Sequence, residues 1–328
     1  MSYRGIGLAN RDILKTTLAH WQGRLFNTFQ SALPQLEIFR VLLATFLTNQ
    51  GPRAAVRSNS GTYFDLAASE PSLPSSVREL LAAGESRLRL AQEVAARPQG
   101  VVIPADAKRL APIIDPPKIL CIGLNYRDHA IESGQPIPTE PVVFGKFGNA
   151  LAADGDPIIV PKVSSKTDYE AELVVVIGRR GKHIAEADAM NHVAGYTVGH
   201  DVSARDWQFK GDAKQWILGK TFDTFAPIGP DLVTADQIAD PHNLPIRLRL
   251  NSTVMQESST KEFIFGIPAL IAYLSQVATL EPGDLIFTGT PPGVGAARKP
   301  PVFLKGGDVT EVEIDGVGLL RNPVQAEA

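Results

Sequence analysis

Beyond Lys118 the sequence consists largely of short apolar runs rich in β-forming residues, and this pattern constrains the fold more than any other feature. The runs lie at residues 119–122, 142–144, 173–177, 194–198, 246–250 and 285–288, and glycine or proline punctuates most of them. Only a few helices intervene, the clearest of which has Pro268 in its first turn and a face formed by Leu270, Ile271, Leu274 and Val277. Many strands with few crossover helices argue against a doubly wound parallel sheet. They predict a mostly-β (α+β) domain built as a sandwich, roll or barrel.

The remaining sequence predicts a smaller domain ahead of this one. The length of 328 residues corresponds to about two domains. Residues 41–66 alternate short strands with turns, and a single helix follows, with Ser76 and Glu79 as its capping box. Six prolines and glycines between residues 97 and 117 indicate a linker. We therefore expect an N-terminal extension at 1–40, a small α+β domain with its linker at 41–117, and the β-rich domain at 118–328.

Composition excludes several classes of function. The net charge of −3 and pI near 6.1 lack the basic field of nucleic-acid-binding proteins. The apolar stretch at 38–47 is interrupted by Arg40 and is too short to span a bilayer, so we expect no membrane partner. The one cysteine, Cys121, cannot form an intrachain disulfide, which fits a reducing compartment.

The start of the chain permits two interpretations. The first 60 residues carry seven Lys/Arg and two Asp/Glu, and apolar residues recur at helical spacing between Leu14 and Phe29. Such a segment is typical of a mitochondrial transit peptide, but an ordinary N-terminal helix docked on the body has the same pattern. We expect a mitochondrial protein, with a cytoplasmic one as the alternative.

Three carboxylates indicate a metal site. In the run Y-E-A-E-L-V-V-V-I-G at 169–178, strand alternation places Glu170 and Glu172 on the same face, at the head of a buried strand. Like charges there repel each other and resist desolvation, and a divalent cation relieves both effects. Asp201 ends another strand-like run and supplies a third oxygen ligand of the kind that Mg²⁺ and Mn²⁺ prefer. The alternative is a strand end whose carboxylates face water.

The segment after Asp201 carries side chains suited to an anionic substrate. If a helix runs on from Asp201, then Arg205 and Gln208 lie on its face at i+4 and i+7. An arginine there can bind a carboxylate through two parallel hydrogen bonds. The alternative is a helix cap at Asp201 and a surface pair of Arg205 with Asp206.

A lysine and a glycine-rich loop offer further contacts. Lys220 can face a carboxylate or a developing enolate, although a solvated lysine gives the same local pattern. The loop F-T-G-T-P-P-G-V-G at 287–295 can bind an oxygen through its N–H groups and threonine hydroxyls. It lacks the features of a P-loop, and the chain has no G-x-S-x-G nucleophile motif. Metal-assisted chemistry is therefore the default expectation.

A histidine and a glutamate are candidates for proton transfer. His129 and Glu132 are three residues apart, so they are neighbours on a helical turn. A carboxylate beside an imidazole fixes its tautomer and raises its basicity, which suits a general base. A surface His–Glu pair is the alternative.

Taken in order, the motifs form a family pattern. G-L-N-Y-x-D-H-x-x-E, Y-E-A-E-L, H-D-V-S-A-R-D-W-Q, L-G-K-T-F-D-T-F and T-G-T-P-P-G-V-G resemble those of the fumarylacetoacetate hydrolase family, from about Lys118 to Pro323. The resemblance implies a mixed β-roll or sandwich with a smaller N-terminal domain, usually as a homodimer. It implies that Mg²⁺ or Mn²⁺ is bound by Glu170, Glu172 and Asp201. It implies a catalytic set of His129, Glu132 and Lys220, the first two on a lid. It implies a substrate-binding set of Arg205, Gln208 and Thr290.

The resemblance also implies the substrate class. Family members act on small 2-oxo and 1,3-dicarbonyl acids through a metal-stabilised enolate, and they hydrolyse C–C bonds, decarboxylate oxaloacetate or tautomerise it. The branch that this chain resembles most is associated with oxaloacetate keto–enol tautomerisation, which is our first expectation. C–C hydrolysis of the acylpyruvate or fumarylacetoacetate type and oxaloacetate decarboxylation are alternatives. A catalytically silent binding or structural subunit is a third reading, which the intact metal and lid residues disfavour.

Overall fold

The structure, a computed structural model, describes residues 41–328. The extension expected at 1–40, with its two interpretations, lies outside the described residues. Within residues 41–328, no helix combines the length and apolarity needed to cross a bilayer.

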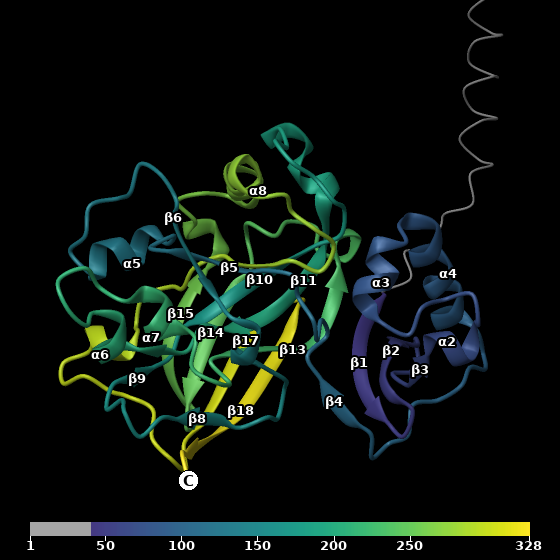
Figure 1. Cartoon of the computed structure of the whole chain (residues 1–328), viewed down its shortest axis with the longest axis horizontal. Helices are drawn as coiled ribbons and strands as arrows, with labels where there is room; N and C mark the ends of the chain where they lie inside the picture. The colour runs from purple at the N-terminus through teal and green to yellow at the C-terminus, as the bar shows by residue number, and fades with distance from the viewer. Residues whose placement is uncertain (1–40) are drawn as a thin grey trace, which may run out of the picture. The chain divides into compact units, whose positions relative to one another are not determined.

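Strand residues outnumber helical ones in the described chain, and the strands form three sheets (Figure 1). The largest, of eleven strands, contains β1 (Leu42–Thr48), β2 (Gly51–Arg57), β3 (Tyr63–Asp65), β4 (Lys108–Leu110), β5 (Ile119–Gly123), β6 (Val142–Lys146), β7 (Leu151–Ala152), β10 (Ala171–Ile177), β11 (Val193–His200), β13 (Ala226–Thr234) and β16 (Leu285–Phe287). The second contains β8 (Ile158–Val160), β14 (Pro245–Leu250), β15 (Thr253–Ser259), β17 (Val309–Ile314) and β18 (Gly318–Ala326). A two-stranded sheet pairs β9 (Thr167–Asp168) with β12 (Ser203–Ala204). All six apolar runs form strands, so the predicted mostly-β class is confirmed.

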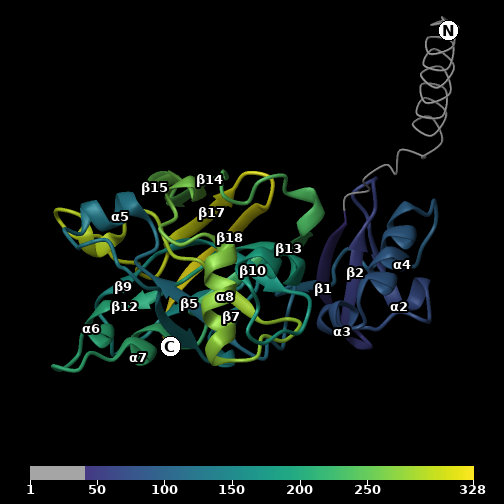
Figure 2. The same cartoon turned by 90° about the horizontal axis from the view of Figure 1, so that it is seen from above.

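The helices of residues 41–328 are short and few. They are α2 (Leu66–Ser69), α3 (Val77–Ala82), α4 (Glu85–Ala96), α5 (Arg127–Glu132), α6 (Arg205–Gln208), α7 (Trp216–Lys220) and α8 (Ile267–Val277). The 3-10 turns are η1 (Gly148–Ala150), η2 (Glu186–His192), η3 (Ala235–Gln237), η4 (Thr260–Glu262) and η5 (Gly295–Ala297). Figures 1 and 2 both place α5, α6 and α7 in one region of the molecule, around the cavity described below.

Strand β10 is the centre of the core. All seven of its residues are buried, because β11 and β16 flank it within its own sheet and β14 and β17 of the second sheet pack against it. Both flanking strands are antiparallel to β10, with Ala171 opposite His200 and Val174 opposite Phe287. The start of β10 therefore lies beside the ends of β11 and β16, and the loops that leave those ends converge there.

Residues 41–117 contain more regular structure than expected, including the short helix α2 and the strand β4. The single predicted helix is two helices, because Gly84 adopts a left-handed φ of 82° between α3 and α4. The predicted cap is present, since the Ser76 hydroxyl accepts the N–H of Glu79. Within the proline-rich segment, β4 pairs with β1, and β1 in turn pairs with β13 of the β-rich part. The division at Lys118 stays a proposal.

A buried carboxylate joins these two parts of the sheet. Asp231 on β13 is 6% exposed and accepts the hydroxyl of Tyr63 at 2.7 Å. It also pairs with Arg109 of β4, whose guanidinium lies 4.8 Å from the ring centroids of both Phe46 and Tyr63. The cluster holds β1, β3 and β4 against β13 through one acceptor.

Asp231→Ala should lower the free energy of unfolding by about 1–3 kcal/mol, because the largely buried Arg109 and Tyr63 groups lose their partner. Arg89→Ala is the matched control: its pair with Glu85 is exposed at 76% and 89%, so its loss should cost less than about 0.5 kcal/mol. Chemical denaturation measures both values. Equal effects would mean that Asp231 has no such joining role.

Candidate active site and metal centre

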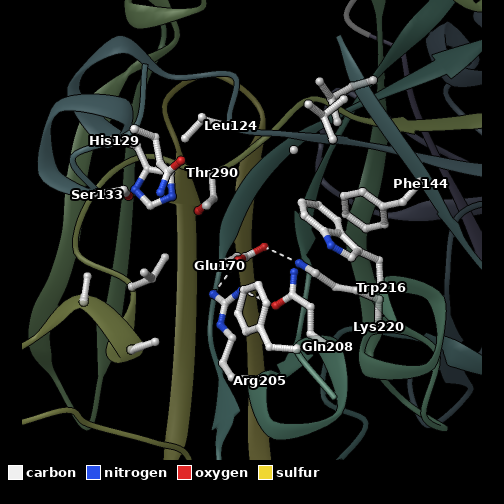
Figure 3. A pocket seen from close by; sticks show the side chains of 18 of the residues that line it. Leu124, His129, Ser133, Phe144, Glu170, Arg205, Gln208, Trp216, Lys220 and Thr290 are labelled. Atoms are coloured by element: carbon white, nitrogen blue, oxygen red, sulfur yellow. Dashed lines mark hydrogen bonds and ion pairs between the residues drawn. The ribbon is translucent and has the colours of Figure 1, made fainter. Parts of the chain in front are cut away.

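A cavity of about 600 Å³ opens where the start of β10 meets the ends of β11 and β16. Eight of the nine sequence-predicted site residues line it: His129, Glu132, Glu170, Glu172, Arg205, Gln208, Lys220 and Thr290. The ninth, Asp201, groups with Glu170 and Glu172 beneath it. Figure 3 shows Glu170 between His129 and Thr290 on one side and Lys220 and Trp216 on the other. The structure thus brings all nine together, and their roles remain predictions.

The three predicted metal ligands form a compact group. One carboxylate oxygen from each of Glu170, Glu172 and Asp201 lies within 4.8 Å of the others, and all three residues are buried. The antiparallel register explains the convergence, because Glu170 and Glu172 flank the first residue of β10 and Asp201 follows the last residue of β11.

The electrostatics of the two glutamates differ. Burial alone would raise the pKa of Glu170, but the charges of Lys220 and Arg205 lower it to about 2. Burial, reinforced by the charges of Asp201 and Glu170, raises the pKa of Glu172 well above its usual range. The Glu172 carboxylate accepts the Gly289 N–H at 2.7 Å, a contact that offsets only part of this effect. Glu172 is therefore the carboxylate whose charge is least compensated.

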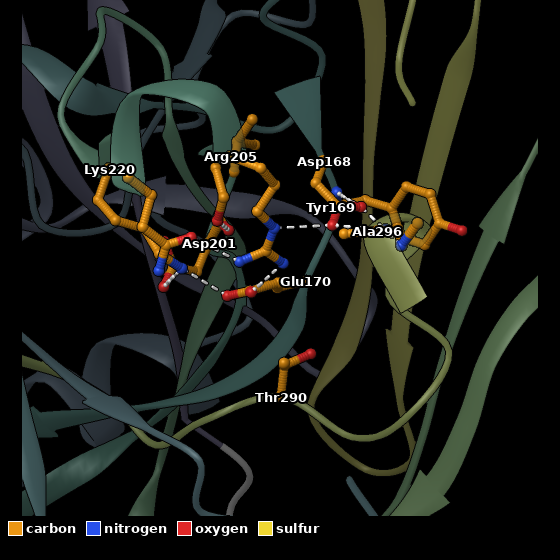
Figure 4. Close-up of polar contacts among 12 residues, drawn as sticks. Asp168, Tyr169, Glu170, Asp201, Arg205, Lys220, Thr290 and Ala296 are labelled. Carbon is orange, nitrogen blue, oxygen red and sulfur yellow. Dashed lines mark hydrogen bonds and ion pairs between the residues drawn. The ribbon is translucent and has the colours of Figure 1, made fainter. Parts of the chain in front are cut away.

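Three cationic side chains contact the triad. Figure 4 shows two of them, Arg205 and Lys220, beside Glu170 and Asp201. The Lys220 ammonium donates to Glu170 at 2.7 Å and to Asp201 at 2.8 Å. Arg205 donates to Glu170 at 2.5 Å and, through its Nε, to Asp168 at 2.8 Å. Lys146 lies 2.7 Å from the second oxygen of Asp201.

The donor set fits a divalent cation. Within residues 41–328, four buried carboxylates, those of Asp168, Glu170, Glu172 and Asp201, face only these three cationic side chains. One negative charge is left without a partner, and it falls on the triad. Oxygen ligands of this type suit Mg²⁺ and Mn²⁺. Glu170, Glu172 and Asp201 would hold the ion.

The predicted proton-transfer pair is formed. His129 and Glu132 lie on α5, and the His129 Nδ1 is 3.2 Å from a Glu132 carboxylate oxygen. Both side chains are partly exposed, at 13% and 31%, and both line the cavity. The Glu132 carboxylate also accepts the N–H of Gly293 at 3.0 Å, which ties α5 to the glycine-rich loop. The imidazole therefore faces the cavity with a carboxylate fixed behind it.

Comparison with known proteins shows the family of this chain. The family model for the C-terminal part of fumarylacetoacetate hydrolase matches residues 118–325. The chain belongs to the fumarylacetoacetate hydrolase family. It is 54% identical to the mitochondrial oxaloacetate tautomerase fahd2 of Xenopus laevis over 266 residues, covering 81% of this chain and 83% of that protein. It is 48% identical to the mitochondrial oxaloacetate tautomerase FAHD2A of Homo sapiens over 275 residues, covering 84% and 88%.

Solved structures of the family share the fold. A fumarylacetoacetate hydrolase from psychrophilic Exiguobacterium antarcticum has a TM-score of 0.75 at 33% identity, with 88% of this chain and 100% of that one covered. Maleylpyruvate hydrolase from Sphingobium sp. SYK-6 has a TM-score of 0.71 at 33% identity, with 87% and 100% covered. The fold expected from the family resemblance is confirmed.

One local expectation needs correction. Asp201, Arg205 and Gln208 do not share a helix face, because α6 spans only Arg205–Gln208 and β12 separates it from Asp201. Arg205 and Gln208 nevertheless meet, with Nη1 donating to Oε1 at 2.9 Å. The alternative pair with Asp206 is absent among residues 41–328, since Asp206 instead accepts from Ser164 and Ser165.

Two residues that contact the site side chains, Asp168 and Lys146, were not predicted from the sequence. Asp168 is fully buried and accepts from Arg205 and from the N–H groups of Gly295 and Ala296. Its only signal is its place two residues before Glu170. Lys146 carries only the signal that it follows an apolar run, and its ammonium binds Asp201 and three main-chain carbonyls.

Glu172→Gln should weaken Mg²⁺ binding by about 100-fold or more, since loss of a ligand exceeds the 10–100-fold cost of changing a residue behind one. The metal-free variant should be at least as stable as wild type, because a neutral amide replaces a carboxyl group whose ionised form is disfavoured by burial and by the charges of Asp201 and Glu170. Calorimetry with Mg²⁺ gives the affinity, and thermal unfolding with and without EDTA gives the stability.

Glu257→Gln is the control for this test, since Glu257 is exposed and pairs with Arg247 outside the cavity. It should bind Mg²⁺ like wild type. Unchanged Mg²⁺ affinity in Glu172→Gln would remove Glu172 from the metal site.

Proposed function

We propose that this protein is a Mg²⁺-dependent oxaloacetate keto–enol tautomerase. The observation that carries the proposal is the meeting, in one cavity, of the buried carboxylate triad and the His129–Glu132 pair. Relatives 48–54% identical to this chain and named oxaloacetate tautomerases support the choice of substrate. Mn²⁺ is the alternative ion.

Tautomerisation moves one proton between C3 and the enol oxygen and needs no attacking water. The bound ion would act as a Lewis acid that stabilises negative charge on the 2-oxo oxygen. His129 takes the C3 proton, and Glu132 holds the imidazole in the required tautomer. Lys220 adds positive charge beside the triad, where the enolate forms. Arg205, Gln208 and Thr290 bind the substrate oxygens.

A fourth cation suits the second carboxylate of oxaloacetate. Lys214 lies in the loop between α6 and α7 and lines the cavity, and its ammonium is 5.7 Å from the Phe209 ring centroid. It makes no ion pair with residues 41–328, unlike Arg205 and Lys220, which hold the triad. We assign Lys214 to the C4 carboxylate, a group that a monocarboxylic 2-oxo acid lacks.

Lys214→Met should raise the KM for enol-oxaloacetate about fivefold, the change for one exposed ionic contact of about 1 kcal/mol. Inhibition by pyruvate, which has no second carboxylate, should be unchanged. Lys210→Met is the control, because Lys210 is in the same loop but stacks 3.9 Å from the Trp207 ring centroid and does not line the cavity. Equal loss of oxaloacetate and pyruvate binding would contradict the assignment.

C–C hydrolysis is the second candidate, favoured by the structural similarity to maleylpyruvate hydrolase. It uses the same residues, with His129 taking a proton from water instead of C3. His129→Ala should therefore depress either reaction by about 10²–10⁴-fold.

The products separate the two candidates. A tautomerase accelerates the decay of enol absorbance at constant total oxaloacetate, without pyruvate release. Pyruvate release from oxaloacetate would point to the decarboxylase alternative. A hydrolase releases two carboxylic products from an acylpyruvate, with ¹⁸O from solvent in one of them. Acylpyruvate cleavage without accelerated enol decay would replace our first choice with the second.

We also propose a homodimer and a mitochondrial location. An exposed apolar group on edge strand β6 and the segments next to it supports the dimer: Val142, Val143, Phe147, Ile217 and Leu218. The basic, acid-poor first 60 residues support import, as do the mitochondrial names of the relatives.

A further inference from the structure

Gln256 has no role in the mechanism above, yet both ends of its side-chain amide form hydrogen bonds to residues of the site. It lies on β15 of the second sheet and is 2% exposed. Its Oε1 accepts the N–H of Ala171, the residue between Glu170 and Glu172, at 2.9 Å. Its Nε2 donates to the Thr290 hydroxyl oxygen and to the Pro291 carbonyl, each at 2.8 Å.

These partners fix which way the amide points. The Pro291 carbonyl can only accept and the Ala171 N–H can only donate, so the two ends of the Gln256 amide cannot be exchanged. Nε2 is therefore a donor to Thr290, and the one proton of the Thr290 hydroxyl must point elsewhere. Thr290 lines the cavity, and its proton has no acceptor among residues 41–328.

We propose that Gln256 is a positioning residue that makes Thr290 a hydrogen-bond donor into the cavity. The inference rests on the proposed function, because a 2-oxo acid dianion and its enolate offer oxygens that only accept. A hydroxyl held as a donor stabilises the charge that grows on such an oxygen, without reorientation during the reaction. Without Gln256, the Thr290 proton can turn to the Pro291 carbonyl or to other nearby acceptors.

A purely structural role must be separated from this one. The bond to Ala171 holds the strand segment that carries Glu170 and Glu172, so loss of Gln256 can also disturb the metal ligands. That effect acts through metal affinity and is independent of the Thr290 hydroxyl. The two roles therefore differ in whether the effects of changing Gln256 and Thr290 multiply.

The test is a double-mutant cycle at saturating Mg²⁺. Thr290→Val should lower kcat about 10²-fold, as for other single preorganised donors, and Thr290→Ser, which keeps the hydroxyl, should stay within about threefold of wild type. Gln256→Met should lower kcat about tenfold, roughly the worth of one hydrogen bond, with a smaller change in KM. In Thr290→Val, adding Gln256→Met should cost less than about threefold more. Fold-losses that multiply, or no kcat loss in Gln256→Met, would overturn the proposal.

Two variants guard against loss of the fold. Glu257→Met introduces the same side chain at the next residue of β15, whose own side chain is exposed, and should match wild type. Gln256→Glu keeps the size of the side chain and can still accept from Ala171. When it is ionised, at a pH above the raised pKa that burial gives this carboxyl group, its other oxygen only accepts and turns the Thr290 proton away from the cavity. It should lose at least as much kcat as Thr290→Val and add little to it, and near-wild-type kcat would also overturn the proposal.

Binding of oxalate separates this inference from the proposed function. Oxalate is an acceptor-only dianion, and its Mg²⁺-dependent affinity, measured by calorimetry across the same variants, does not depend on turnover. Non-multiplying losses of oxalate affinity with no oxaloacetate tautomerisation by wild type would leave the role of Gln256 standing and reject the proposed function. If wild type tautomerises oxaloacetate but the losses of oxalate affinity multiply, the proposed function stands and the role of Gln256 is rejected.

Discussion

The burial of four carboxylates at one end of β10 is the constraint on which the rest of this structure depends. Asp168, Glu170, Glu172 and Asp201 are each at most 6% exposed. Isolated charges at that depth are unstable, so each needs a partner from elsewhere in the chain. Arg205, Lys220 and Lys146 provide three such partners from α6, α7 and β6. These ion pairs tie the three short elements to the carboxylates.

The loop at 288–296 donates main-chain hydrogen bonds to carboxylates in several parts of the site. Its N–H groups point to three carboxylates on different elements: Gly289 to Glu172, Gly293 to Glu132, and Gly295 to Asp168. Glycine is required at Gly293, where φ is 101° and a Cβ would overlap the Met255 carbonyl. One loop thereby holds Glu172 of the carboxylate triad, Glu132 beside His129, and Asp168, the partner of Arg205, in a fixed relation.

Local patterns were sufficient to predict six of the strands beyond Lys118 and nine candidate residues, but not the other strands there or the residues that support the site. Alternation identifies Glu170 and Glu172, and helical spacing identifies His129 with Glu132, because each signal lies within a few positions. Gln256 shows no such signal, since its partners Ala171 and Thr290 are 85 and 34 positions away. The break between α3 and α4 escaped prediction for a different reason: a continuous apolar face conceals a glycine that takes φ of 82°.

The buried charges and the residues at the cavity rim are separate groups, and this separation affects which reaction such a site can favour. Beneath the cavity, the carboxylates and their cations are fixed by mutual bonds, so this part suits any 2-oxo acid that binds through a metal. His129, Glu132 and Lys214 lie at the more exposed rim, where a change of side chain disturbs no buried charge. Under the proposed function, such a fold would keep enolate stabilisation constant while the rim would set which proton moves and which second substituent is accepted. Tautomerases and C–C hydrolases can therefore share one scaffold, and the rim residues are where their difference must be sought.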